Sequence, residues 1–148
     1  MADEAQHVAI LQESYRKWHE SRGRSVDQWM SICADDVRFG SIAQAPPGAS
    51  YLTSYTGRSA LGQYFQGLID DWDMIEYVVE EFVAQGDRVV MLGRCSWRFR
   101  KTGRVVATPK ADAWRFADGK ATEFFEYFDT AQLRDAISGS VVTEPRAL

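Results

Sequence analysis

Four runs of alternating apolar and polar residues fill most of positions 74–129: MIEYVVEEFVAQ (74–85), RVVMLGRCSWRFR (88–100), RVVATPKADAWRF (104–116) and ATEFFEYFD (121–129). They are rich in β-branched and aromatic residues, and a period of two is typical of strands with two distinct faces. The short segments between them contain the glycines of GD, KTG and ADG, which favour tight hairpin turns. The runs therefore predict four consecutive antiparallel strands in one sheet.

The sequence before position 74 has helical spacing instead. Apolar residues recur at steps of three and four up to about residue 21, which predicts a first helix, and two shorter helices follow. Ser59 is the expected N-cap of the third helix. The inward faces comprise Val8, Leu11, Tyr15 and Trp18 in the first helix, Trp29, Ile32 and Cys33 in the second, and Leu61, Tyr64, Phe65 and Leu68 in the third. A strand over 37–42 and a last helix over 130–137 complete an α+β fold, with helices packed on one face of a curved antiparallel sheet.

Composition excludes several classes of protein. The 148 residues are 45% hydrophobic and 26% charged, which is typical of one folded domain. We assign the domain to residues 1–137 and a C-terminal tail to residues 138–148. No apolar run approaches the ~18 residues of a membrane span. The net charge of −4 argues against nucleic-acid binding. The acidic and polar N-terminal residues predict no secretion signal, and Cys33 and Cys95 are predicted to be free thiols in the cytoplasm.

Five motifs together resemble the NTF2-like superfamily, specifically its SnoaL-like and ketosteroid-isomerase-like branch: ADDVRF (34–39), YTGRSALGQYF (55–65), TGR (102–104), WRFADGK (114–120) and EYFDTAQL (126–133). The resemblance covers roughly residues 5–137. It implies a cone-shaped α+β barrel of the kind that limonene epoxide hydrolase and scytalone dehydratase share, with a deep apolar pocket between sheet and helices. It also implies a homodimer formed through the sheet.

Both faces of the predicted sheet are apolar, which agrees with a dimer. One face would cover the pocket, and the other would meet a second subunit. The candidates for that second face are Val90, Leu92, Phe125 and Tyr127. The alternative is that helix ends and loops cover it.

The ADG turn decides which polar side chains enter the pocket. A type I turn with a glycine bulge would pair Phe116 with Lys120. This register puts on one face Lys110, Asp112, Trp114, Phe124, Glu126 and Phe128. A two-residue turn would shift the pairing by one and put Asp112 and Glu126 on opposite faces.

Two carboxyl groups on a face otherwise made of Trp and Phe are the candidate catalytic pair. Burial disfavours the charged form of a carboxyl, unless Lys110 or an arginine reaches it. By resemblance, Asp112 matches the acid with which ketosteroid isomerases donate a hydrogen bond to the substrate oxyanion, and Glu126 matches the acid with which limonene epoxide hydrolases protonate the epoxide. The alternative is a Lys110–Glu126 salt bridge with a solvated Asp112 near the rim.

The known mechanisms of these relatives do not transfer whole. Ser41 stands where the isomerases have their base, and the only histidines, His7 and His19, both lie in the first helix. Tyr15 is a candidate hydroxyl donor near the oxyanion-hole tyrosine of the isomerases; the alternative is a core tyrosine. Phe39 and Ser41 are further predicted binding residues. Trp18, Trp97 and Phe99 are predicted to line the pocket as well, and simple core packing is the alternative for these three.

The sequence thus predicts a cofactor-independent and metal-free enzyme of the isomerase, dehydratase or cyclase type, acting on a small hydrophobic cyclic molecule. The segment QAPPGASYLTSY (44–55) is expected to form a mobile lid that covers the pocket with Tyr51, Leu52 and Tyr55. The alternative function is a non-catalytic binding module or dimeric scaffold. Two inward carboxyls within reach of one ligand atom favour the enzyme, whereas carboxyls neutralised by Lys110 favour the binding module.

Overall fold

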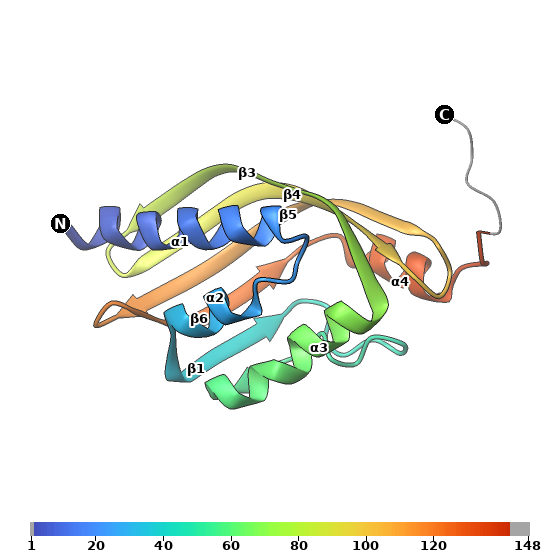
Figure 1. Ribbon diagram of the computed structural model, residues 1–148, viewed down its shortest axis with the longest axis horizontal. Helices are drawn as coiled ribbons and strands as arrows, with labels where there is room; N and C mark the ends of the chain where they lie inside the picture. Colours follow the sequence, from blue (N-terminus) through green and yellow to red (C-terminus); the bar gives the residue numbers. More distant parts are fainter. Residues whose placement is uncertain (1, 143–148) are drawn as a thin grey trace.

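A computed structural model describes residues 2–142, within which the chain forms four α-helices and six strands (Figure 1). In chain order the elements are α1 (Ala2–Glu20), α2 (Val26–Ile32), β1 (Cys33–Ser41), β2 (Tyr55–Thr56), a 3-10 turn (Arg58–Leu61), α3 (Gly62–Asp71), β3 (Trp72–Gln85), β4 (Arg88–Phe99), β5 (Val105–Ala117), β6 (Lys120–Tyr127) and α4 (Thr130–Ser138). The α+β class is confirmed. Of the predicted tail, residues 143–148 lie outside the described residues.

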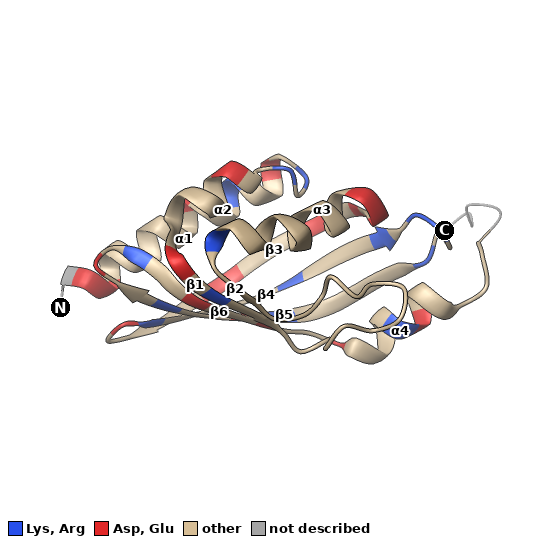
Figure 2. Ribbon diagram, turned by 90° about the horizontal axis from the view of Figure 1, so that it is seen from below, with Lys and Arg blue, Asp and Glu red and all other residues tan. Residues whose placement is uncertain are grey.

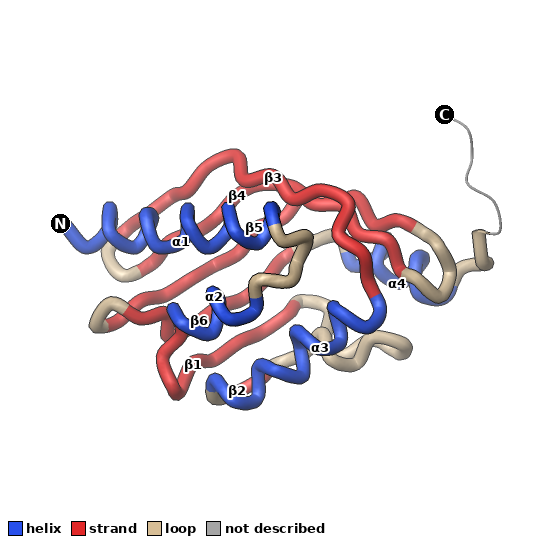
Figure 3. The backbone as a smooth tube through the Cα atoms, viewed as in Figure 1, coloured by secondary structure: helices blue, strands red, loops and turns tan. Residues whose placement is uncertain are grey.

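The six strands form one curved, open sheet in the order β2-β1-β6-β5-β4-β3 (Figure 3). The four long strands, β3 to β6, are antiparallel neighbours, as their short turns predict. The sheet is nevertheless mixed, because β1 pairs with β6 in parallel. The chain leaves the sheet through α3 and re-enters it at the opposite edge, so the last strand of the meander comes to lie beside the first strand of the chain.

Helices α1, α2 and α3 cover the same face of the sheet (Figure 2). Buried side chains of α1 and α2 pack there, among them Leu11, Tyr15, Trp18 and Trp29. The predicted cap of α3 is wrong: Ser59 lies inside the 3-10 turn, and α3 begins without a side-chain cap. α4 does have a cap, because the carboxylate of Asp129 accepts hydrogen bonds from the backbone of Ala131 and Gln132.

The opposite face of the sheet carries apolar side chains in register across strands. Phe125 of β6 is paired with Ala113 of β5, and Ala113 with Val90 of β4. The neighbouring row joins Tyr127, Ala111 and Leu92 in the same way. Tyr127 is 46% exposed. This face is the one predicted to meet a second subunit.

The segment between β1 and β2 is attached to α3 through Tyr51. A Cβ added at Gly67 would collide with the ring of Tyr51, so the ring lies directly on the helix backbone. The Tyr51 hydroxyl donates to Asp71 at 2.9 Å and accepts from the Trp72 indole at 2.7 Å. Of the three side chains that were expected to cover the pocket, Tyr51, Leu52 and Tyr55, it is Leu52 that is buried and reaches the interior.

We expect Gly67→Ala to lower the free energy of unfolding by about 1–3 kcal/mol, because the added methyl must displace the Tyr51 ring. Gly62→Ala is the matched control in the same helix, since a Cβ there meets nothing within 4 Å. It should leave stability unchanged or raise it by up to ~1 kcal/mol through helix propensity. Urea unfolding of both variants measures the difference in stability. Equal stability of the two variants would contradict the packing of the Tyr51 ring on Gly67.

Candidate active site

The two candidate carboxyl groups lie side by side on the inner face of the sheet. Asp112 of β5 and Glu126 of β6 are directly paired across the strands. The same row continues to Ser41 of β1 on one side and to Met91 of β4 on the other. Side chains paired in this way have Cβ atoms about 4.5–5.5 Å apart. The two carboxyls are therefore immediate neighbours.

The turn that leads to this register differs from the predicted one. Ala117 pairs with Lys120, so the turn has two residues, Asp118 and Gly119. Their φ angles of 52° and 77° are those of a type I′ hairpin. The expected pairing of Phe116 with Lys120 is therefore wrong.

A β-bulge, one residue pair beyond the turn, returns Asp112 and Glu126 to the same face of the sheet. Phe116 pairs with Ala121 and Arg115 with Glu123, which leaves Thr122 as an extra residue. A bulge of this kind reverses the alternation of side chains on one strand. Asp112 and Glu126 consequently share a face despite the two-residue turn. Asp112 is paired with Glu126, whereas the expected pairing of Phe116 with Lys120 would have placed it opposite Phe124.

Asp112 is surrounded by donors. The residue is only 1% exposed, so the alternative of a solvated Asp112 is wrong. Its Oδ1 accepts from Lys110 Nζ at 2.6 Å, and its Oδ2 accepts from the hydroxyls of Tyr15 at 2.5 Å and Tyr77 at 3.2 Å. The indole of Trp114 in turn donates to the Tyr15 oxygen at 3.0 Å. Asp112 acts here as an acceptor only, in contrast to the donor role that the isomerase resemblance implies.

Lys110 is the cation that reaches both buried carboxyls. Its Nζ lies 2.6 Å from Asp112 Oδ1 and 3.4 Å from Glu126 Oε1, with the side chain only 10% exposed. Burial lowers the pKa of Lys110, but the negative charges of Asp112 and Glu126 outweigh it and raise that pKa well above its usual value. Lys110 therefore stays protonated at neutral pH and counterbalances one of the two carboxyl charges.

Glu126 has one oxygen without a partner. Its Oε1 accepts from the Tyr64 hydroxyl at 2.9 Å. Its Oε2 is buried and makes no hydrogen bond. Most buried polar side-chain atoms are paired, because leaving one unpaired typically lowers the stability of the protein by ~1–3 kcal/mol. This unpaired oxygen distinguishes Glu126 from Asp112, whose two oxygens are both paired.

Three tyrosines, Tyr15, Tyr64 and Tyr77, form a cluster with Lys110, Asp112 and Glu126. These tyrosines keep their hydroxyl protons. Burial first, and the nearby carboxyls second, raise the pKa of Tyr15 and Tyr77, beside Asp112, and of Tyr64, beside Glu126, well above the usual value. Tyr64 and Tyr77 were not among the predicted site residues. Tyr64 was predicted to face inward, so its hydroxyl was a usable signal. Tyr77 follows a register shift between Met74 and Glu76, which disrupts the simple alternation of β3.

A cavity of about 100 Å³ lies over this cluster. All five tryptophans of the chain line it, together with the carboxyls and the tyrosines. Of the predicted binding residues, Ser41 and Phe99 do not line it: Ser41 is buried next to Glu126, and Phe99 packs on Trp72 with ring centroids 4.8 Å apart. The others do line it, namely Trp18, Phe39, Trp97, Lys110, Trp114, Phe124 and Phe128.

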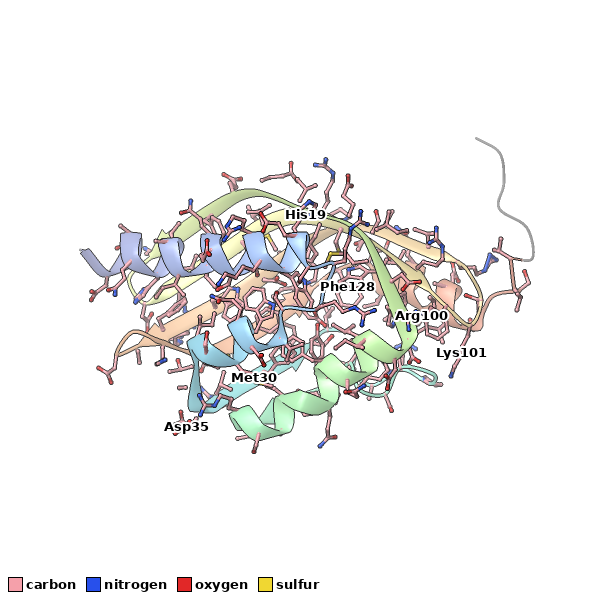
Figure 4. The ribbon with its side chains drawn as sticks, in the orientation of Figure 1. His19, Met30, Asp35, Arg100, Lys101 and Phe128 are labelled. Atoms are coloured by element: carbon pink, nitrogen blue, oxygen red, sulfur yellow. The ribbon has the colours of Figure 1, made fainter. Side chains whose placement is uncertain are left out.

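Three of the residues that line the cavity are half-buried. Trp97, Lys110 and Phe128 are the lining residues that are not buried. Phe128 follows β6 and lies between α1 and α3 in Figure 4. In the part of the chain from 2 to 142, no three His, Cys, Asp or Glu side chains come together as a metal site. No helix in that part is long and apolar enough to cross a membrane.

The sequence of residues 11–124 matches the family model of the SnoaL-like domain, which is more than half of the chain. The chain belongs to the SnoaL-like domain family. The match includes Lys110 and Asp112 and ends two residues before Glu126. The NTF2-like, SnoaL-like branch implied by the sequence motifs is thereby confirmed. A search of curated proteins found no match.

Solved structures of SnoaL-like and NTF2-like proteins share the fold. An NTF2-like protein of unknown function from Burkholderia pseudomallei has a TM-score of 0.78 and 24% identity, over 90% of this chain and 98% of that one. TerC, co-crystallised with polyporic acid, has a TM-score of 0.76 and 22% identity, over 90% and 99%. A candidate SnoaL-like polyketide cyclase from Jannaschia sp. CCS1 has a TM-score of 0.73 and 21% identity, over 92% and 94%.

Proposed function

We propose that this SnoaL-like protein is a cofactor-independent enzyme of the isomerase, dehydratase or cyclase type, acting on a small hydrophobic cyclic substrate by acid–base chemistry. One observation carries the proposal: Glu126 lines an aromatic cavity, and its Oε2 is buried and unpaired. A carboxylate held in this way is a suitable general base, because it is desolvated and has an acceptor free for a substrate proton.

The proposed reaction begins with a proton transfer to Glu126. Its Oε2 takes a proton from a substrate carbon next to a carbonyl group, and the electron pair of the broken C–H bond moves onto the carbonyl oxygen. The ammonium of Lys110, 3.4 Å from Glu126 Oε1, stabilises the negative charge that develops nearby. Glu126 then returns the proton to another atom of the substrate, which gives an isomerised product without any cofactor.

Asp112 and the tyrosines are positioning residues in this proposal. Asp112 holds Lys110 and the hydroxyls of Tyr15 and Tyr77, and Tyr64 holds Glu126. These bonds fix the orientation of the base before the substrate binds. Preorganised polar groups of this kind contribute to catalysis because they need not reorient during the reaction.

A non-catalytic binding module is the second candidate function. Lys110 contacts both carboxyls, and every oxygen of Asp112 is already paired. That arrangement favours binding without catalysis, whereas the free oxygen of Glu126 favours an enzyme. The polyporic acid bound to TerC supports a small-molecule ligand under either function.

Proton exchange with solvent separates the two candidates. The protein is incubated in heavy water with cyclohexanone and cyclohexenone, and proton NMR follows the loss of signal from the carbons next to the carbonyl. We expect exchange faster than in protein-free buffer at the same pH. Binding of these ketones without any acceleration of exchange would overturn the enzyme proposal and favour the binding module.

We also propose that the protein is a cytoplasmic homodimer joined through the outer sheet face. The apolar rows of Val90, Ala113 and Phe125, and of Leu92 and Tyr127, form the surface that supports it. Cys33 and Cys95 are buried free thiols, as expected in a reducing compartment. Light scattering at micromolar concentration should give about twice the chain mass of 16.8 kDa. A mass equal to that of one chain would contradict the dimer.

A further inference from the structure

The hydrogen-bond inventory of the cluster restricts what a ligand can offer. The ammonium of Lys110 has three N–H groups, and its contacts are Asp112 Oδ1, Glu126 Oε1 and Tyr77 Oη, at 2.6, 3.4 and 3.4 Å. The hydroxyl protons of Tyr15 and Tyr77 point to Asp112, and that of Tyr64 to Glu126. The donors of the cluster are thus already engaged with its own acceptors.

Glu126 Oε2 is the acceptor that remains. It is buried in a residue that is only 2% exposed, and it makes no hydrogen bond. A ligand that fills the cavity and reaches this oxygen must supply a proton to satisfy it. A ligand that brings only an acceptor, such as an ether oxygen, leaves Oε2 unpaired.

The charges around the cavity act in the same direction. Lys110 is the only cation among the described residues that line the cavity, and it stands against two carboxyl groups, Asp112 and Glu126. An added anionic oxygen beside Oε2 would therefore meet a like charge in a desolvated site. The same ligand in its uncharged, protonated form donates a hydrogen bond instead.

The size and walls of the cavity indicate a ring. An apolar cavity of ~150 Å³ holds a benzene molecule, and the cavity here, at about 100 Å³, has room for no more than one small ring. The indoles of Trp29 and Trp114 are stacked with centroids 5.4 Å apart, and Phe124 meets Trp114 edge-on at 4.6 Å. Such faces and edges favour a single unsaturated ring over a flexible chain.

We infer that the pocket selects single-ring compounds bearing an acidic hydroxyl, phenols or enols, in their uncharged form, with that hydroxyl donating to Glu126 Oε2, and that it rejects the corresponding oxyanions. This inference rests on the proposed function, because it names the substrate class of the same site. It is also consistent with the proposed proton transfer. An enolate forms in the site only as Glu126 gains the proton that the substrate loses. The total charge of the site and the ligand therefore does not change during the reaction.

Calorimetric titration with three probes tests this inference. Phenol has the hydroxyl donor, anisole has the same ring with a methylated oxygen, and para-nitrophenol ionises near neutral pH. We expect phenol to bind about tenfold or more tightly than anisole, as one hydrogen bond to a charged acceptor provides. Para-nitrophenol should lose affinity about tenfold per pH unit above its own ionisation. Equal affinity of phenol and anisole, no binding of phenol, or tighter binding of para-nitrophenolate than of para-nitrophenol would each overturn the inference.

Two glutamate variants locate the effect. Glu126→Gln removes the charge and introduces an amide donor, so it should abolish the preference for the uncharged phenol or reverse it. Glu123→Gln is the matched control on the same strand; Glu123 pairs with Arg38 and Arg115 and does not line the cavity. It should bind all probes like the wild type. If Glu126→Gln does not fold, the affinities of the wild-type protein for phenol, anisole and para-nitrophenol are sufficient to test the inference.

The outcomes also separate this inference from the proposed function. Selective binding of uncharged phenols without ketone proton exchange would retain the ligand class and remove the enzyme. Ketone exchange without any preference for hydroxyl donors would retain the enzyme and remove the ligand class.

Discussion

Replacing Lys110 by methionine should lower the free energy of unfolding at pH 7 by about 3–5 kcal/mol. Methionine retains the length and the apolar stem of the side chain, so the change removes mainly the charge. It leaves the paired carboxyls of Asp112 and Glu126, which are 1% and 2% exposed, without their cation. Breaking a buried ion pair from one side is far more destabilising than the loss of a surface pair.

The control for this variant is Lys101→Met. Lys101 is exposed, lies at the periphery of the molecule in Figure 4 and does not line the cavity. Its replacement should change stability by no more than ~0.5 kcal/mol. Urea unfolding at pH 7 compares the two variants. Equal stability of Lys110→Met and Lys101→Met would contradict the ion cluster.

The pH dependence of Lys110 has a defined sign. Its pKa is raised in the folded protein, so its contribution is fully present below the unfolded pKa of ~10.4 and is lost as the pH rises through the higher folded value. The difference between wild type and Lys110→Met should therefore persist from neutral pH to about pH 10.

The second large effect concerns the rate of proton exchange. Glu126→Gln should reduce the exchange of ketone protons by about 10²–10⁴-fold, which is the usual contribution of a positioned general base. An amide of the same shape cannot accept the proton, although it fills the same space. Proton NMR in heavy water measures both rates under the same conditions.

Glu123→Gln serves again as the control, because it changes a glutamate of the same strand that lies outside the cavity. Its exchange rate should equal that of the wild type. If Glu126→Gln retains the wild-type rate while it remains folded, the base is another group and the proposed mechanism is wrong.

Local pattern was sufficient to predict most of the fold. The period of two and the short turns predicted β3 to β6 as neighbours, and the helical spacing predicted α1 to α3 on one face. The parallel pairing of β1 with β6 was not predictable in this way, since it joins segments that are distant in sequence. The N-cap at Ser59 failed because a 3-10 turn precedes α3.

The candidate site was partly predictable, and β-bulges explain the remainder. Asp112 and Glu126 share the inner face because Thr122 is an extra residue on β6, whereas the prediction assumed an irregularity in the turn itself. Sequence alone does not tell where a bulge falls, because any position of a strand can hold one. The register shift before Tyr77 concealed its inward direction in the same way. The position of Lys110 between both carboxyls depends on the path of a flexible side chain, which alternation does not specify.

The most direct test of this account is a crystal structure of the protein with phenol bound. We expect the ring inside the cavity, packed against the aromatic side chains that line it, with its hydroxyl oxygen within about 2.5–3.0 Å of Glu126 Oε2. Lys110 should remain in contact with Asp112. A phenol whose oxygen contacts Lys110 or Asp112 instead, or a cavity that remains empty at a saturating concentration while Glu126 Oε2 stays unpaired, would contradict it.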